Sequence, residues 1–204
     1  MGFDFSTALA FALTSLLIEL TPGPNMTYLA LLAAQAGRRA GYAAVAGVAL
    51  GLGLVGLGTA LGLAALMTAS PLLYAAMRWA GIGYLLYLAW EAWRDSEPSN
   101  DFRVETDTRY FVRGLITNLL NPKAFVFYVA ILPTFLDPAD SAAGQALTLS
   151  AIYVLVATAV HVAIVTLAGF LSPLLASERI MSITGKLFAI ALAGVAFWMG
   201  WSTR

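Results

Sequence analysis

One run of residues constrains the fold of this chain more than any other. Between Phe5 and Gly37 the sequence has 33 residues and a single charged side chain, Glu19. As a straight helix this run would be about 50 Å long, whereas the hydrocarbon core of a bilayer is about 30 Å thick. A TPGPN motif at positions 21–25 lies near its centre. The run therefore predicts a membrane-spanning segment that is tilted, kinked or re-entrant.

The composition also indicates a membrane protein. Of 204 residues, 60% are hydrophobic and 11% are charged, whereas a soluble domain has about 25% charged residues. The mean hydropathy is +0.82, so most of the chain is expected to face lipid. The sequence has no cysteine, one histidine and no net charge. We therefore expect no metal site, no cofactor and no nucleic-acid partner.

Six hydrophobic segments are long enough to cross a bilayer, since a spanning helix needs roughly 20 apolar residues. They are about 5–30, 42–67, 72–93, 112–136, 145–171 and 183–202. Turn residues separate them at Gly41, Ser70-Pro71, the 94–110 loop, Asp137-Pro138 and Ser172-Pro173. Most basic residues fall on one side of this arrangement. The positive-inside rule then places the 94–110 loop in the cytoplasm and both termini outside. Glu91 and Arg94, near the cytoplasmic end of the third segment, are expected to snorkel toward water.

The two halves of the sequence resemble each other. A second motif, NLLNPK at 118–123, places Pro122 100 residues after Pro22, and SPLL occurs at both 70–73 and 172–175. With three spans in each half, the second half must enter the membrane with the opposite orientation. We therefore predict an all-α integral membrane protein of six transmembrane helices in a 3+3 inverted repeat, with helices 1 and 4 broken by proline. A single transmembrane domain would fill 1–204, with repeat one at about 1–93, the loop at about 94–110 and repeat two at about 111–204.

The proline motifs carry the most informative chemistry. Proline frees the carbonyl four residues earlier, and broken backbone inside a bilayer is tolerated mainly where it lines a cavity. Each motif also resembles a helix start, which attracts carboxylates. Asn121 fits an N-cap with Pro122 in the first helical position, while Thr21-Pro22 and Gly23-Pro24 are alternatives in the first motif. An ordinary kink is the alternative for each proline taken alone, but two matched motifs favour a site.

Charged side chains accompany the motifs. Lys123 has the wrong sign for a helix N-terminus, which indicates an anion nearby, either Glu19 or a substrate carboxylate. Glu19 and His161 are candidates for proton coupling or for binding an ammonium group. A structural Glu19–Lys123 ion pair, and a His161 bonded to a backbone carbonyl, remain alternatives. The candidate substrate-binding residues are Thr21, Pro22, Gly23, Pro24, Asn25, Asn118, Asn121, Pro122 and Lys123.

Glycines in the second segment are spaced for close helix packing. Gly47 and Gly51 form a small-xxx-small pattern, which allows two helix backbones to approach closely. The pattern fits either packing within one bundle or contact between two copies of the chain.

Together these motifs resemble the lysine exporter (LysE/RhtB) family of amino-acid efflux permeases. The resemblance rests on TPGPN at 21–25, GRRAG at 37–41, GVALG at 47–51, AGIGYLLYL at 80–88 and GLITNLLNPKA at 114–124. It implies about six spans in the cell inner membrane, a homodimer, and proton-driven export of amino acids or related small zwitterionic metabolites. It covers the motif residues but not Glu19 or His161. Many relatives have an aspartate where this chain has Asn25.

We therefore predict an exporter that works by alternating access rather than an enzyme. The alternatives are a membrane-embedded enzyme or a divalent-cation carrier of similar topology. No Gly-x-Ser-x-Gly motif accompanies His161, and one histidine without cysteines is a poor ligand set for a metal.

Overall fold

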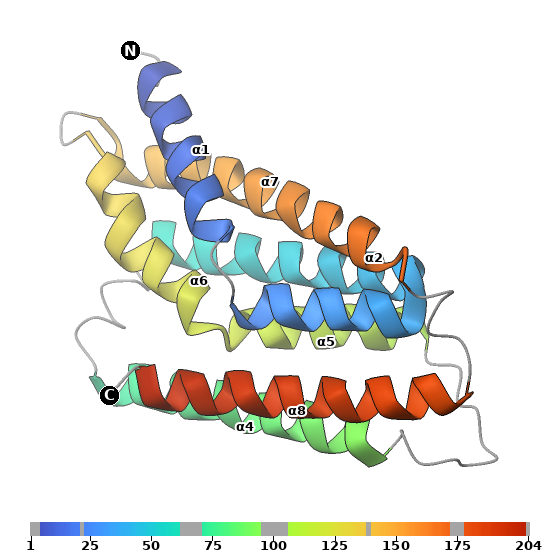
Figure 1. The fold of residues 1–204 in the computed structure, drawn as a ribbon. Coiled ribbons are helices and arrows are strands. Elements are labelled where there is room, and N and C mark those ends of the chain that lie inside the picture. Colours follow the sequence, from blue (N-terminus) through green and yellow to red (C-terminus); the bar gives the residue numbers. More distant parts are fainter. Residues whose placement is uncertain are drawn as a thin grey trace.

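The computed structural model describes residues 5–20, 23–61, 71–94, 106–137, 140–171 and 178–202, and every regular element in these ranges is helical (Figure 1). The elements are α1 (Phe5–Glu19), α2 (Pro24–Ala60), α4 (Pro71–Arg94), α5 (Asp107–Leu119), α6 (Pro122–Val126), the π-helical η1 (Phe127–Ile131), the 3-10 helix η2 (Leu132–Phe135), α7 (Ala142–Ala168) and α8 (Glu178–Ser202). The predicted all-α class is confirmed for the described part of the chain. The 3+3 inverted repeat remains a prediction.

Several helices have the length and surface of membrane spans. Within the described ranges, α2 and α7 are each long and apolar enough to cross a bilayer. The segment from Asp107 to Phe135 would make a third span, bent by 51° at its break. Large apolar side chains such as Phe5, Leu155 and Phe197 are exposed on the outer surface. An apolar surface of this kind is what contact with lipid requires.

The helix α2 is a hairpin of two arms, 24–36 and 38–60, joined at Gly37. Gly37 has φ 83° and ψ 174°, a backbone conformation that is essentially restricted to glycine. Figure 1 shows the chain reversing direction at this turn. Asn118 of α5 accordingly contacts both arms, through Asn25 in the first and Gly51 in the second.

The sequence placed this turn at Gly41, and that prediction is wrong. Gly41 lies inside the second arm and is buried. A Cβ atom on Gly41 would lie 2.6 Å from Cγ1 of Val165 in α7. Gly41 is therefore required for close packing between α2 and α7, and the reversal depends on Gly37.

Two groups of helices make up the structure. The helices α1, α2, α5 and α7 pack together, with α2 between α5 and α7, while α4 and α8 pack on each other and lie beside this group (Figure 1). Glycines bring α2 and α5 into backbone contact. A Cβ on Gly47 would lie 2.0 Å from the Phe111 carbonyl oxygen, and one on Gly114 would lie 2.1 Å from that of Ala44. The glycine pattern at Gly47 and Gly51 thus serves packing within one chain.

We expect Gly47→Ala to destabilise the protein by about 1–3 kcal/mol, because the added methyl group forces α2 and α5 apart. Thermal unfolding of the detergent-purified protein measures this effect. Gly53→Ala is the matched control, since a Cβ there meets nothing within 4 Å among the described atoms. Equal melting temperatures for the two variants would contradict the close contact.

Basic side chains gather at one end of the structure. The turn of α2, the end of α4, the start of α5, the end of α7 and the start of α8 all lie at the right in Figure 1. There Arg39 forms an ion pair with Asp107 at 2.7 Å, and the Arg38 guanidinium lies 3.8 Å from the ring centroid of Phe170. This end is the one predicted to face the cytoplasm, and its orientation in the membrane stays a prediction.

Glu91 does not snorkel, so this prediction is wrong. Its side chain is buried, with the residue 4% exposed, and it accepts hydrogen bonds from Arg109 and Arg113 of α5. A buried carboxylate is stable where cations pair with it and donate hydrogen bonds to it. The pairing therefore fastens the end of α4 to α5.

Candidate functional site

The two proline motifs lie against each other in the structure. The side-chain amide of Asn25 donates a hydrogen bond to Oδ1 of Asn118 at 2.8 Å. A Cβ on Gly23 would lie 3.2 Å from Cδ of Lys123, so the lysine side chain passes directly over this glycine. Thr21 and Pro22 fall outside the described residues. Residues 93 positions apart in the sequence thus form one cluster.

The local sequence explains both breaks. Asn121 caps α6, because its Oδ1 accepts a hydrogen bond from the Lys123 backbone at 3.0 Å, and Pro122 occupies the first helical position. The Asn118 carbonyl, which a proline at 122 leaves without its helix partner, accepts from the Asn121 backbone instead, at 3.0 Å. In the first motif the helix starts at Pro24 after an extended Gly23, which selects the second of the two predicted alternatives.

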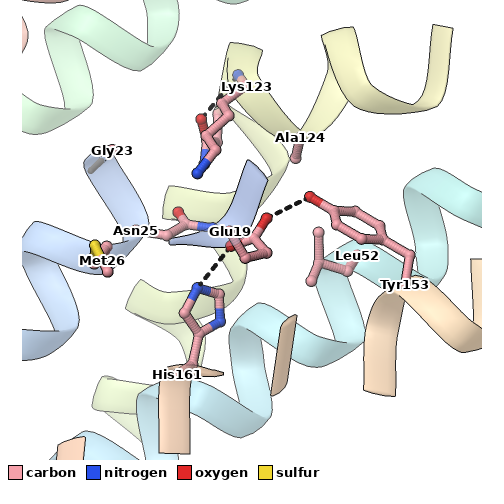
Figure 2. Close-up of a pocket in the computed structure, with 10 residues that line it drawn as sticks. Glu19, Gly23, Asn25, Met26, Leu52, Lys123, Ala124, Tyr153 and His161 are labelled. Atoms are coloured by element: carbon pink, nitrogen blue, oxygen red, sulfur yellow. Dashed lines mark hydrogen bonds and ion pairs between the residues drawn. The ribbon is translucent and has the colours of Figure 1, made fainter. Parts of the chain in front are cut away.

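A narrow pocket opens where the breaks meet (Figure 2). Its lining comes from α1, both arms of α2, the second break with α6, and α7. The lining residues are Glu19, Gly23, Asn25, Met26, Leu52, Asn121, Lys123, Ala124, Tyr153 and His161. The predicted candidates Glu19, Lys123 and His161, from three different helices, are therefore brought together in one cavity.

Glu19 is the anionic centre of this pocket. The residue is 6% exposed at the end of α1. Its Oε1 accepts a hydrogen bond from the Tyr153 hydroxyl at 2.6 Å, and its Oε2 lies 3.4 Å from Nε2 of His161 (Figure 2). Lys123 lines the same pocket. These contacts compensate the cost of removing a carboxylate from water.

His161 faces the carboxylate. Among the described residues, neither of its ring nitrogens has a hydrogen-bond partner. The predicted alternative of a bond to a backbone carbonyl is therefore not what the structure shows. The 3.4 Å separation between Nε2 of His161 and Oε2 of Glu19 places two titratable side chains next to each other.

Tyr153 is the polar lining residue that the sequence analysis missed, beside the apolar Met26, Leu52 and Ala124. Its ring stacks on Phe127 of η1 with centroids 3.8 Å apart, which orients its hydroxyl toward Glu19. Aromatic packing of this kind fixes a ring at little entropic cost. Nothing in the sequence distinguishes Tyr153 from the other seven of the chain's eight tyrosines.

Not every predicted residue lines this pocket. Asn118 does not line the pocket but accepts a hydrogen bond from Asn25. It also packs closely on α2, because a Cβ on Gly51 would lie 2.7 Å from Nδ2 of Asn118. Pro24 borders a second small pocket instead. That pocket is lined by Pro24, Gly81, Tyr84, Leu85, Thr117, Leu120 and Asn121.

The pocket places an acidic and a basic side chain in a cavity between interrupted, apolar helices. An interior polar site at the junction of broken helices is typical of membrane transport proteins. A comparison with protein families matches residues 16–202 to the LysE type translocators. The chain belongs to this family, so the resemblance drawn from its motifs is confirmed.

Individual relatives agree with this assignment. The chain is 31% identical over 183 residues to a homoserine/homoserine lactone efflux protein of Salmonella typhimurium, covering 88% of each chain. It is 30% identical over 174 residues to an uncharacterized membrane protein of Pseudomonas aeruginosa, covering 81% of this chain and 79% of the relative. It is 29% identical over 194 residues to an uncharacterized membrane protein of Vibrio cholerae, covering 94% and 95%. No solved structure matches the chain significantly.

Proposed function

We propose that this protein exports an amino acid, or a closely related small zwitterion, across the cell inner membrane in exchange for protons. The observation that carries the proposal is the pocket with Glu19 and Lys123 in its lining. A zwitterion carries one carboxylate and one ammonium group close together. Lys123 would bind the carboxylate and Glu19 would bind the ammonium group, so each charge meets its opposite away from water.

The amide side chains add hydrogen bonds to this recognition. Oδ1 of Asn25 is buried and has no hydrogen-bond partner among the described residues. A buried acceptor without a partner costs about 1–3 kcal/mol, which a substrate N–H group would recover. Asn121 lines the same pocket and Asn118 holds Asn25 in place. Among the predicted binding residues, Gly23 leaves room for the Lys123 side chain.

Competition at Glu19 would couple the two fluxes. The carboxylate can bind either a proton or the substrate ammonium group, and binding of one lowers its affinity for the other. Tyr153 and His161 hold the carboxylate in both conditions, and His161 would pass the proton. Substrate would leave when a proton arrives, and the site would lose that proton on the cytoplasmic side.

Alternating access is the mechanism that fits this geometry best. Each break supplies a point where half-helices can change angle without breaking further backbone hydrogen bonds. In the predicted scheme, repeat one (about 1–93) and repeat two (about 111–204) would move against each other around the pocket. The loop at about 94–110 would be cytoplasmic, both termini would be outside, and two copies would form a homodimer.

Efflux from loaded vesicles tests the function directly. Because a relative is named for homoserine efflux, radiolabelled homoserine is the first substrate to use, followed by the other amino acids. We expect efflux from substrate-loaded proteoliposomes to accelerate when the outside is made acidic. Substrate-loaded liposomes that lack the protein should show only the slow background leak. No gradient-dependent flux of any amino acid would refute the proposal.

A further inference from the structure

The second pocket is a neighbour of the first. Both are lined by Asn121, and the first turn of α2 separates them, because Gly23, Asn25 and Met26 border one pocket while Pro24 borders the other. The wall between them thus consists of the two breaks. Backbone at a break is held by fewer helix hydrogen bonds than backbone inside a helix. A change of angle at the breaks would connect the two cavities.

A line of polar groups continues from the second pocket to the end of α4. Thr117 lines the pocket, and its hydroxyl donates to the Arg113 carbonyl at 2.7 Å. Tyr84 lines it from α4, two helical turns before Glu91 in the same helix. Glu91 in turn pairs with Arg113 and Arg109. The charged cluster of Glu91, Arg109 and Arg113 therefore lies one helical turn beyond Thr117, toward the predicted cytoplasmic end.

The boundary that contains this pocket is thinly packed. The helix α4 packs chiefly on α8 and makes few contacts with α5 and α6, while α8 also packs on α2. Figure 1 shows α4 and α8 running side by side. The pairing of Glu91 with Arg109 and Arg113 links α4 to α5. Breaking that link would let α4 and α8 separate from α5.

We propose that the second pocket is the chamber through which the amino acid passes between the cytoplasm and the central pocket, and that Glu91 with Arg109 and Arg113 forms the gate at its outer end. This inference rests on the proposed export function. In the structure the gate is closed, since Glu91 is buried and bound to both arginines. Opening requires water or a substrate carboxylate to replace Glu91 at the guanidinium groups.

The absence of cysteine from the chain allows a clean test. Thr117→Cys places a nearly isosteric thiol in the chamber, where the native residue is 3% exposed. The probe is a membrane-impermeant methanethiosulfonate that carries a trimethylammonium group. In inside-out vesicles we expect slow labelling with the gate intact, and labelling about tenfold faster when Glu91→Gln is added. The reason is that lowering the free energy that favours the closed gate by about 1.4 kcal/mol raises the open fraction tenfold. Right-side-out vesicles should show no such labelling.

Three controls make the test decisive. Ala157→Cys is equally buried in α7 and lines neither pocket, so its labelling should not respond to Glu91→Gln. Arg109→Gln, at a half-exposed position, is the milder gate variant if Glu91→Gln does not fold. Treatment with the reagent should reduce efflux by Thr117→Cys relative to the same variant left untreated.

The contrary results are equally clear. Any of four results would overturn the proposed chamber. They are an unchanged labelling rate in folded gate variants, faster labelling of Ala157→Cys as well, labelling from the outer side, and full efflux after modification. Efflux by the unlabelled variant would meanwhile support the export function independently.

Discussion

Lys123→Met is expected to reduce efflux by about 100-fold, because removing the charge proposed to pair with the substrate carboxylate costs about 2–5 kcal/mol. Methionine keeps an unbranched side chain over Gly23, where Cδ of the lysine now lies, so the variant should still fold. The loss should occur mainly as weaker substrate binding. Vesicle efflux at several substrate concentrations measures it, with Lys123→Arg as the charge-conserving control. Normal flux in Lys123→Met would exclude the lysine from carboxylate recognition.

The reversed pair separates recognition from scaffolding. In the double variant Glu19→Lys, Lys123→Glu, the two charges are exchanged but their sum is kept. We expect this protein to fold and to be inactive, because the substrate would meet each charge in the wrong place. Full activity would show that the two side chains serve the structure alone.

Glu19→Gln is expected to uncouple substrate movement from the proton gradient. Glutamine still accepts the hydrogen bond from Tyr153 but cannot take up a proton at neutral pH. A gradient of one pH unit corresponds to 1.36 kcal/mol, so a one-proton exchanger can hold about a tenfold substrate gradient against it. In Glu19→Gln that gradient should disappear. Substrate exchange without a pH difference should persist but need higher substrate concentrations, because a neutral amide binds the ammonium group less tightly than a carboxylate does.

The matched control for this variant is Ser15→Ala. Ser15 lies one turn earlier in α1, is fully buried, and bonds the Phe11 carbonyl away from the pocket. Its replacement should leave the coupled gradient intact. A Glu19→Gln protein that still builds the tenfold gradient would assign proton coupling to another group, with His161 the first to examine.

The sequence could predict the helical segments and the region of the site because both leave local signals. Runs of apolar residues mark the helices, and an uncharged run of 33 residues can fit a bilayer only with a break. The prolines located both breaks, and Asn121 before Pro122 is a local capping signal that the structure reproduces. Charges inside apolar segments are rare enough that Glu19, Lys123 and His161 stood out.

The rest depends on contacts between distant residues. Tyr153 binds Glu19 across 134 positions, and no local pattern marks it. Glu91 was expected to reach water because its arginine partners lie in another helix, across the 94–110 loop. Gly37 and Gly41 both fit a turn by sequence, and only the packing of Gly41 against Val165 decides between them. Such choices are made by tertiary packing, which periodicity does not record.

The turn at Gly37 has a consequence for variation within this protein. Twelve residues separate it from Asn25, about 18 Å along the helix, so a substrate in the pocket never touches it. Both arms of the hairpin nevertheless contact Asn118. The angle at Gly37 determines the distance between the two arms at that residue. A side chain at that position would shift the arms and alter selectivity at a distance. Screens for altered transport should therefore recover changes at this remote glycine alongside changes in the pocket itself.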